Sequence, residues 1–141
     1  MSLINTKDVI TMLMPYPNIS SDLAVKPHMY ICWHSNTPNY KFVKCQSLKP
    51  SMIGNPKFVH YVDEPADITR NPFKRTSRID CDKSIATIAV AYDDRLRTTL
   101  RPDVCEDLFT SILEELYCDG YSEPAIDEAE LITLNRYVQP V

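Results

Sequence analysis

The sequence is poor in glycine: Gly54 and Gly120 are the only two glycines among 141 residues. Phosphate-binding loops and dinucleotide-binding turns need several closely spaced glycines, because their backbone must approach the ligand without a side chain in the way. P-loop nucleotidases and Rossmann-type dinucleotide-binding proteins are therefore excluded.

The five cysteines form no Cys-x-x-Cys pair, and neither they nor the three histidines are grouped at metal-ligand spacing. A zinc site is a minor alternative, and we expect no metal and no cofactor. An odd number of cysteines among apolar neighbours indicates reduced thiols in a cytoplasmic protein. No apolar run approaches the length of a membrane-spanning helix, and the start of the chain does not resemble a signal peptide, so we expect no membrane contact.

Hydrophobic residues make up 44% of the sequence, which predicts a single domain spanning residues 1–141 with a core of its own.

The charges are unevenly distributed along the chain. Residues 26–78 carry nine Lys and Arg against three Asp and Glu, whereas residues 79–141 carry five against fourteen. This asymmetry predicts a basic surface in the middle of the chain and an acidic carboxy-terminal portion, with ordinary solvated charges as the alternative.

Short apolar segments bounded by Pro, Asn, Asp and Ser predict strands at Asp8–Met14, Met29–Trp33, Tyr40–Leu48, Lys57–Val62, Thr76–Asp82 and Ile85–Ala91. The run 85–91 is almost continuously apolar, which is typical of one well-buried strand. The proline-rich segment 49–75 is loop-like and too long for a bare connection in a compact domain, so we interpret it as an insertion that covers a binding face or contacts a partner.

Two helices are expected in the carboxy-terminal part. Apolar residues repeat at helical spacing over 102–118, with Pro102 at the first helical position and Gly120 available to end the helix. Asp127 followed by Glu130 resembles a capping box and predicts a short helix over 127–134. The pattern predicts an α+β, mainly β fold, with an antiparallel barrel or strongly bent sheet and one main helix packed on it.

The amino-terminal strands resemble a known family. The motif D-V-I-T-M-L-M-P-Y-P, a loop, and then V-K-P-H-M-Y-I-C is similar to the opening of the MazF/PemK/Kid toxin endoribonucleases, in which a strand, a loop, an Arg-Pro step and a second strand follow in that order. The resemblance extends, with gaps, over most of Asp8–Leu116. It implies a small SH3-like antiparallel barrel, a cytoplasmic homodimer that cleaves single-stranded RNA without a metal, and a small antitoxin protein whose acidic segment occupies the RNA groove.

The resemblance also implies a catalytic site. The family's Arg serves as acid, base and charge stabiliser, and a Thr near the end of the third strand assists it; the matching positions are Lys26 and either Gln46 or Ser47. Lysine offers a point charge where arginine offers a planar fork, so the exchange is not conservative. His28 lies two residues beyond Lys26 and would supply proton transfer at neutral pH, with an ordinary structural histidine as the alternative.

Several side chains are candidates for contacts with the RNA. The candidate phosphate contacts are Lys41, Lys44, Lys49, Lys74, Arg75 and Arg78, and the candidate stacking platforms are Tyr16, Tyr30, Trp33 and Tyr40. The alternatives are a core position for Trp33 and ordinary solvated strand positions for several of the lysines. Asp80 and Asp82 resemble a metal-binding pair, but without a third ligand we expect them to face a turn or to form salt bridges instead. Because the family Arg is missing, two other hypotheses stay open: a catalytically silent barrel that binds nucleic acid or protein, and an unrelated small adaptor.

Overall fold

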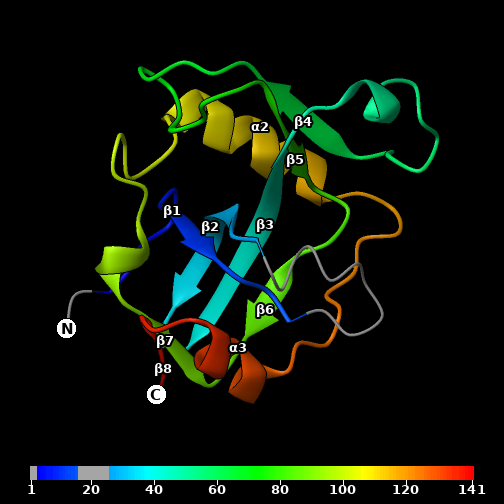
Figure 1. Cartoon of the computed structure of the whole chain (residues 1–141). Helices are drawn as coiled ribbons and strands as arrows, with labels where there is room; N and C mark the ends of the chain where they lie inside the picture. The colour runs from blue at the N-terminus through cyan, green and yellow to red at the C-terminus, as the bar shows by residue number, and fades with distance from the viewer. Residues whose placement is uncertain (1–2, 16–25) are drawn as a thin grey trace.

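The computed structural model describes residues 3–15 and 26–141, which form a bent antiparallel sheet with helices packed on it (Figure 1). Its strands are β1 (Val9–Met12), β2 (His28–Asn36), β3 (Asn39–Ser47), β4 (Tyr61–Glu64), β5 (Ser77–Asp80), β6 (Ile85–Thr87), β7 (Val90–Tyr92) and β8 (Val138–Pro140). Its helices are α2 (Glu106–Leu116), α3 (Glu128–Leu134) and the short 3₁₀ turns η1 (Pro50–Met52) and η2 (Asp94–Leu96).

The main sheet follows the order β1-β2-β3-β5-β4, and β6 pairs with the other part of β3. The neighbouring strands are antiparallel throughout, as in the pairs Ile10 with Tyr30 and Ile31 with Val43. β7 and β8 form a separate two-stranded sheet. The expected α+β, mainly β fold is therefore confirmed, while the pairing among the described residues ends at β1 on one side and at β4 on the other.

Side chains of β1, β2 and β3 alternate between two apolar cores, one on each face of the sheet. One core joins the strands to α2, through Val9, Ile31, Val43, Leu108 and Ile112. The other core joins them to α3 and β7, through Ile10, Tyr30, Phe42, Tyr92 and Leu131. α2 lies near β4 and β5, and α3 lies beside the β7–β8 pair, close to the carboxy terminus (Figure 1). The sheet is thus buried on both faces, which explains why its central strands are so apolar.

The apolar run 85–91 is not one strand, so that prediction is wrong. The chain leaves the main sheet after Thr87, turns at Ile88 and Ala89, and enters the second sheet at Val90. The Glu128 carboxylate caps this turn, because it accepts hydrogen bonds from the backbone nitrogen atoms of Ile88 (3.3 Å) and Ala89 (2.9 Å). The expected strand 57–62 is also wrong for residues 57–60, since β4 begins only at Tyr61.

The main helix is shorter than its apolar pattern suggests. Its amino-terminal cap is Cys105. Pro102 lies before the helix, and its carbonyl oxygen accepts a hydrogen bond from the Val9 nitrogen (2.8 Å). Residues 102–104 therefore run along β1 instead of opening the helix. Gly120 lies in a turn beyond the helix end, with a φ of 84°. The short helix α3 is confirmed, and its Asp127 cap accepts from the Glu130 nitrogen at 3.0 Å.

None of the helices in residues 3–15 and 26–141 is long and apolar enough to cross a membrane.

Candidate functional site

An open cleft of about 280 Å³ lies at the end of the main sheet where β2 begins, β3 ends and β5 begins. The antiparallel register creates it, because Met29 lies opposite Cys45 and Ser47 lies opposite Ser77. Side chains that are far apart in the sequence therefore meet at one edge. The cleft is lined by Pro27, His28, Met29, Cys45, Gln46, Ser47, Phe73, Lys74, Arg75 and Ser77.

The cleft brings together three residues that the sequence predicts for the site: His28, Gln46 and Ser47. Lys26 is exposed and directly precedes the lining residue Pro27, but its own side chain does not line the cleft. Ser47 is exposed, and His28 and Gln46 are half-buried. The predicted catalytic residues are thus neighbours at one sheet end, with Lys26 next to the cleft instead of inside it.

The His28 ring has a defined orientation. Its Nδ1 atom lies 3.0 Å from the Lys26 carbonyl oxygen, and a carbonyl oxygen can only accept a hydrogen bond. In the neutral form of the ring this contact places the proton on Nδ1. Imidazole is the side chain that most often transfers protons near neutral pH, so His28 is the candidate general base of the cleft.

Two cations of the cleft come from the segment before β5. Lys74 and Arg75 are exposed, and the side chain of neither makes an ion pair or a hydrogen bond with another residue in the described parts of the chain. Both are among the candidate phosphate contacts expected from the sequence. They line the cleft together with the exposed Ser47, an arrangement that suits an anionic ligand such as a phosphodiester, while the buried Ser77 hydroxyl donates to the Arg75 carbonyl at 3.0 Å.

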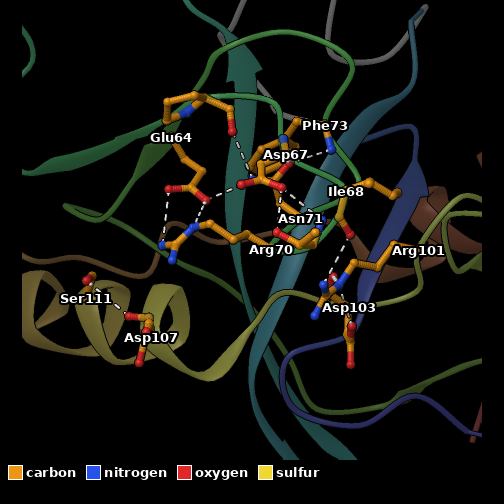
Figure 2. Close-up of polar contacts among 12 residues, drawn as sticks. Glu64, Asp67, Ile68, Arg70, Asn71, Phe73, Arg101, Asp103, Asp107 and Ser111 are labelled. Carbon is orange, nitrogen blue, oxygen red and sulfur yellow. Dashed lines mark hydrogen bonds and ion pairs between the residues drawn. The ribbon is translucent and has the colours of Figure 1, made fainter.

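The loop that carries these two cations is held by a buried amide (Figure 2). Asn71 is fully buried, and its Nδ2 atom donates to Glu64 Oε2 at 2.8 Å and to the Pro65 carbonyl at 3.0 Å. Its Oδ1 atom accepts from the backbone nitrogen atoms of Phe73 at 3.0 Å and Asp67 at 3.3 Å. The proline-rich segment that looks like a loose loop in the sequence is therefore fixed at its centre.

The same loop is tied to the start of α2. Arg70 Nε donates to the buried Glu64 carboxylate at 2.9 Å, and the Arg70 carbonyl accepts from the Cys105 nitrogen at 2.8 Å. Arg101 Nη1 donates to the Ile68 carbonyl at 3.2 Å (Figure 2). These contacts connect the position of the cleft wall to the position of the helix.

Arg78 is a structural residue, and its predicted role as a phosphate contact is wrong. Only 2% of its surface is exposed. The guanidinium donates to both Asp63 oxygens at 2.8 and 2.9 Å, and to the Met52 carbonyl at 2.9 Å. It also lies 3.7 Å from the centre of the Tyr61 ring. The hydrogen bond with Asp63 raises the pKa of Arg78, so the residue remains charged.

Lys44 and Asp80 form a second charge pair beside the cleft. The Lys44 ammonium lies 3.4 Å from Asp80 Oδ2, and Gln46 Nε2 donates to the same oxygen at 3.3 Å. Asp80 is buried, and burial raises the pKa of its carboxyl group while Lys44 opposes that shift. Lys44 does not line the cleft. Asp80 therefore forms a salt bridge, one of the two alternatives expected from the sequence, and it also accepts the hydrogen bond that orients the Gln46 amide.

The other predicted contacts lie elsewhere. Lys49 is exposed just before η1 but does not line the cleft, and Tyr16 lies outside the described residues. Tyr30 and Tyr40 are fully buried, which contradicts their prediction as stacking platforms. Trp33 is half-buried, and its Nε1 atom donates to Ser84 Oγ at 2.9 Å.

In residues 3–15 and 26–141, no group of three or more His, Cys, Asp or Glu side chains is arranged to hold a metal ion. The five cysteines are free thiols.

Comparison with family models, with curated proteins and with solved structures gives no match for this chain.

Proposed function

We propose that this protein is a MazF/PemK-like endoribonuclease that binds single-stranded RNA in the cleft and cleaves it without a metal ion. The observation that carries the proposal is the meeting of His28, Gln46 and Ser47 with the exposed cations Lys74 and Arg75 at one sheet end. The likeness of the first two strands to the family supports the same function. In this proposal the bent sheet corresponds to the family's SH3-like barrel.

The chemistry follows from the lining residues. His28 Nε2 removes the proton from the ribose 2′-hydroxyl, and the 2′-oxygen attacks the phosphorus. The bond to the 5′-oxygen breaks, so the products are a 2′,3′-cyclic phosphate and a 5′-hydroxyl end. Ser47 donates a hydrogen bond to the charged phosphorane, and the Lys26 ammonium next to the cleft stabilises its charge and supplies the proton for the leaving oxygen.

The proposal includes two partners that the resemblance implies, a second copy of this chain and a small antitoxin protein. A homodimer would place two such clefts in one particle. A small antitoxin protein with an acidic segment would compete with RNA for the same cations, Lys74 and Arg75, because a carboxylate and a phosphate are both anions that Lys and Arg bind.

A second candidate function is a catalytically silent RNA-binding module. One observation favours it: Lys26, which stands where the family has its catalytic Arg, does not line the cleft. The cations and hydroxyl groups would then bind the RNA backbone without cutting it.

Cleavage of a long unstructured RNA with a chelator present tests the proposal. We expect cleavage by the natural sequence, and a loss of about 100-fold or more in His28→Ala, since general acid–base groups contribute factors of this size. Ser47→Ala and Lys26→Ala should also lose activity. His60→Ala is the matched control, because His60 lies beside Glu115 of α2 and not in the cleft.

Three other outcomes of this cleavage experiment would change the conclusion. RNA binding without any cleavage supports the silent module. If the protein neither binds nor cleaves RNA, both functions are wrong. Equal activity in His28→Ala and His60→Ala removes His28 from the mechanism.

A further inference from the structure

A second cleft of about 360 Å³ adjoins the first one. Met29 and Lys74 line both clefts, so the two share a wall. The far side of the second cleft comes from the segment 95–100 around η2 and from Tyr137, which precedes β8. The sequence gives no signal for this site, because its walls come from segments that are distant along the chain.

Arg95 is held in a fixed orientation in this second cleft. Its Nε and Nη2 atoms donate to the two oxygens of Asp93 at 2.9 and 3.0 Å, and its guanidinium lies 4.2 Å from the centre of the Tyr137 ring. Asp93 is buried, and the hydrogen bonds from Arg95 hold the pKa of its carboxyl group well below the usual range. Asp93 thus stays ionised and keeps the guanidinium plane in place.

The outer side of that guanidinium is available to a ligand. The Arg95 side chain is 59% exposed although it is paired. Asp93 accepts from two of the five N–H groups of Arg95, and Nη1 donates no hydrogen bond to another described residue. A flat cation backed by an aromatic ring is a surface on which a nucleic-acid base stacks, and its remaining N–H groups can bind a phosphate oxygen.

We propose that the second cleft is a nucleotide-binding subsite that continues the RNA path of the first cleft. This inference rests on the proposed function and extends it. Lys74 in the shared wall contacts a phosphate between the two clefts, and the neighbouring nucleotide stacks on the outer face of Arg95. Arg97 adds positive charge, which Asp8 and Asp94 offset in part at distances of 3.8 and 3.7 Å. The substrate is therefore an extended single strand that occupies both clefts, and a dinucleotide fills only the first.

The test measures binding of a dinucleotide and of a twelve-nucleotide oligouridylate to the inactive His28→Ala protein and to variants made in it. Thr99→Glu places a negative charge in the second cleft without removing any hydrogen bond of the described residues, since the exposed Thr99 side chain makes none. We expect it to weaken binding of the long strand about 10-fold or more, because base stacking and phosphate contacts contribute that much, and to leave the dinucleotide unchanged. Thr110→Glu, on an exposed position of α2, is the matched control.

Arg95→Gln gives an independent measurement, and Arg136→Gln is its control. Arg136 is exposed and lies 5.5 Å from the same Tyr137 ring, but it does not line the cleft. Selective loss of long-strand binding in Arg95→Gln, with an unchanged melting temperature, supports the subsite.

If Thr99→Glu and Thr110→Glu bind the long strand equally, or if Thr99→Glu weakens the binding of both ligands alike, the second subsite is wrong while the first cleft stands. If the parent protein binds neither ligand, the proposed function fails and the subsite fails with it.

Discussion

Lys74 and Arg75 differ from Arg78 in almost every physical respect, although the three cations lie within five residues of one another. Lys74 and Arg75 are exposed in the cleft, whereas only 2% of Arg78 is exposed. The Arg78 guanidinium donates its hydrogen bonds to Asp63 and to the Met52 carbonyl. A basic cluster in a sequence therefore contains two kinds of residue, those that can bind an anionic ligand and those that hold strands together.

Strand register explains the difference. β5 begins at Ser77, so Arg78 lies inside the ladder and directly opposite Asp63 of β4. Opposite charges that face each other across two strands attract, and here the Tyr61 ring covers the Arg78 guanidinium at 3.7 Å. Lys74 and Arg75 precede the strand and have no cross-strand neighbour. Mutations can test whether this division into structural and binding cations is correct.

The largest effect is expected for Arg78→Ala. The substitution removes three hydrogen bonds, leaves the Met52 carbonyl with only the Asn55 nitrogen as a donor (3.3 Å) and opens space against Tyr61. Asp63 is partly exposed and can regain water, so we expect a loss of about 3 kcal/mol in the free energy of unfolding, the lower end for breaking a buried pair. Urea denaturation followed by fluorescence measures it.

Arg75→Ala is the control for Arg78→Ala, because it removes the same charge from an exposed position three residues earlier. Its free energy of unfolding should stay within about 0.5 kcal/mol of the natural sequence. Comparable destabilisation by the two substitutions would mean that the two arginines do not differ in the way described.

The second largest effect is expected for Asn71→Ala. Its side chain makes four hydrogen bonds that hold the loop between Glu64 and Phe73, and its loss leaves the buried Phe73 nitrogen without this acceptor. We expect a loss of about 2 kcal/mol in stability, together with weaker RNA binding because the loop that carries Lys74 is no longer fixed. Asn55→Ala, in a more exposed turn, should cost less than about 1 kcal/mol. Normal RNA affinity in Asn71→Ala would show that the loop does not need this anchor.

Local patterns were sufficient for much of the fold. The apolar segments at 8–14, 29–33, 40–48 and 76–82 each contain or overlap a strand, and the Asp127 capping signal gives the correct bounds of α3. The run 85–91 failed because its turn is stabilised by Glu128, which lies 39 residues further along the chain than Ala89. A partner at that separation leaves no trace in the local sequence.

The candidate site was predictable only in part. His28 and Ser47 share the cleft because the register of β2, β3 and β5 follows from three strands that the sequence does indicate. The role of Arg78 depends on the pairing of β4 with β5, and half of β4, including Asp63, lies outside its expected range. The anchoring role of Asn71 depends on a buried carboxylate in the segment that looks like loop. Contacts between irregular segments carry no periodicity, so pattern analysis misses them.

A smaller effect is expected for Lys74→Ala, on binding and not on stability. Each cation that neutralises a phosphate of a single strand releases counterions, so the slope of log affinity against log salt should become less steep by about 0.7. Lys57→Ala, which removes an exposed lysine outside both clefts, should leave the slope unchanged. Fluorescence anisotropy over a series of salt concentrations measures the slope, and equal slopes for the two variants would remove Lys74 from the binding surface.

The smallest effect is expected for Asp80→Asn, which tests the other buried charge pair, with Lys44, by pH. Burial raises the pKa of the folded-state carboxyl group above its unfolded value, which is about 4. Between these two pKa values the folded protein binds more protons than the unfolded chain, so this group makes stability fall as pH rises from about 4. Asparagine does not titrate and can still accept a hydrogen bond from Gln46, so the variant should lose less stability than the natural sequence between pH 4 and pH 7.

Asp119→Asn, at an exposed position, is the control and should keep the natural pH dependence. Identical pH profiles for Asp80→Asn and the natural protein would mean that Lys44 compensates the burial of Asp80 completely.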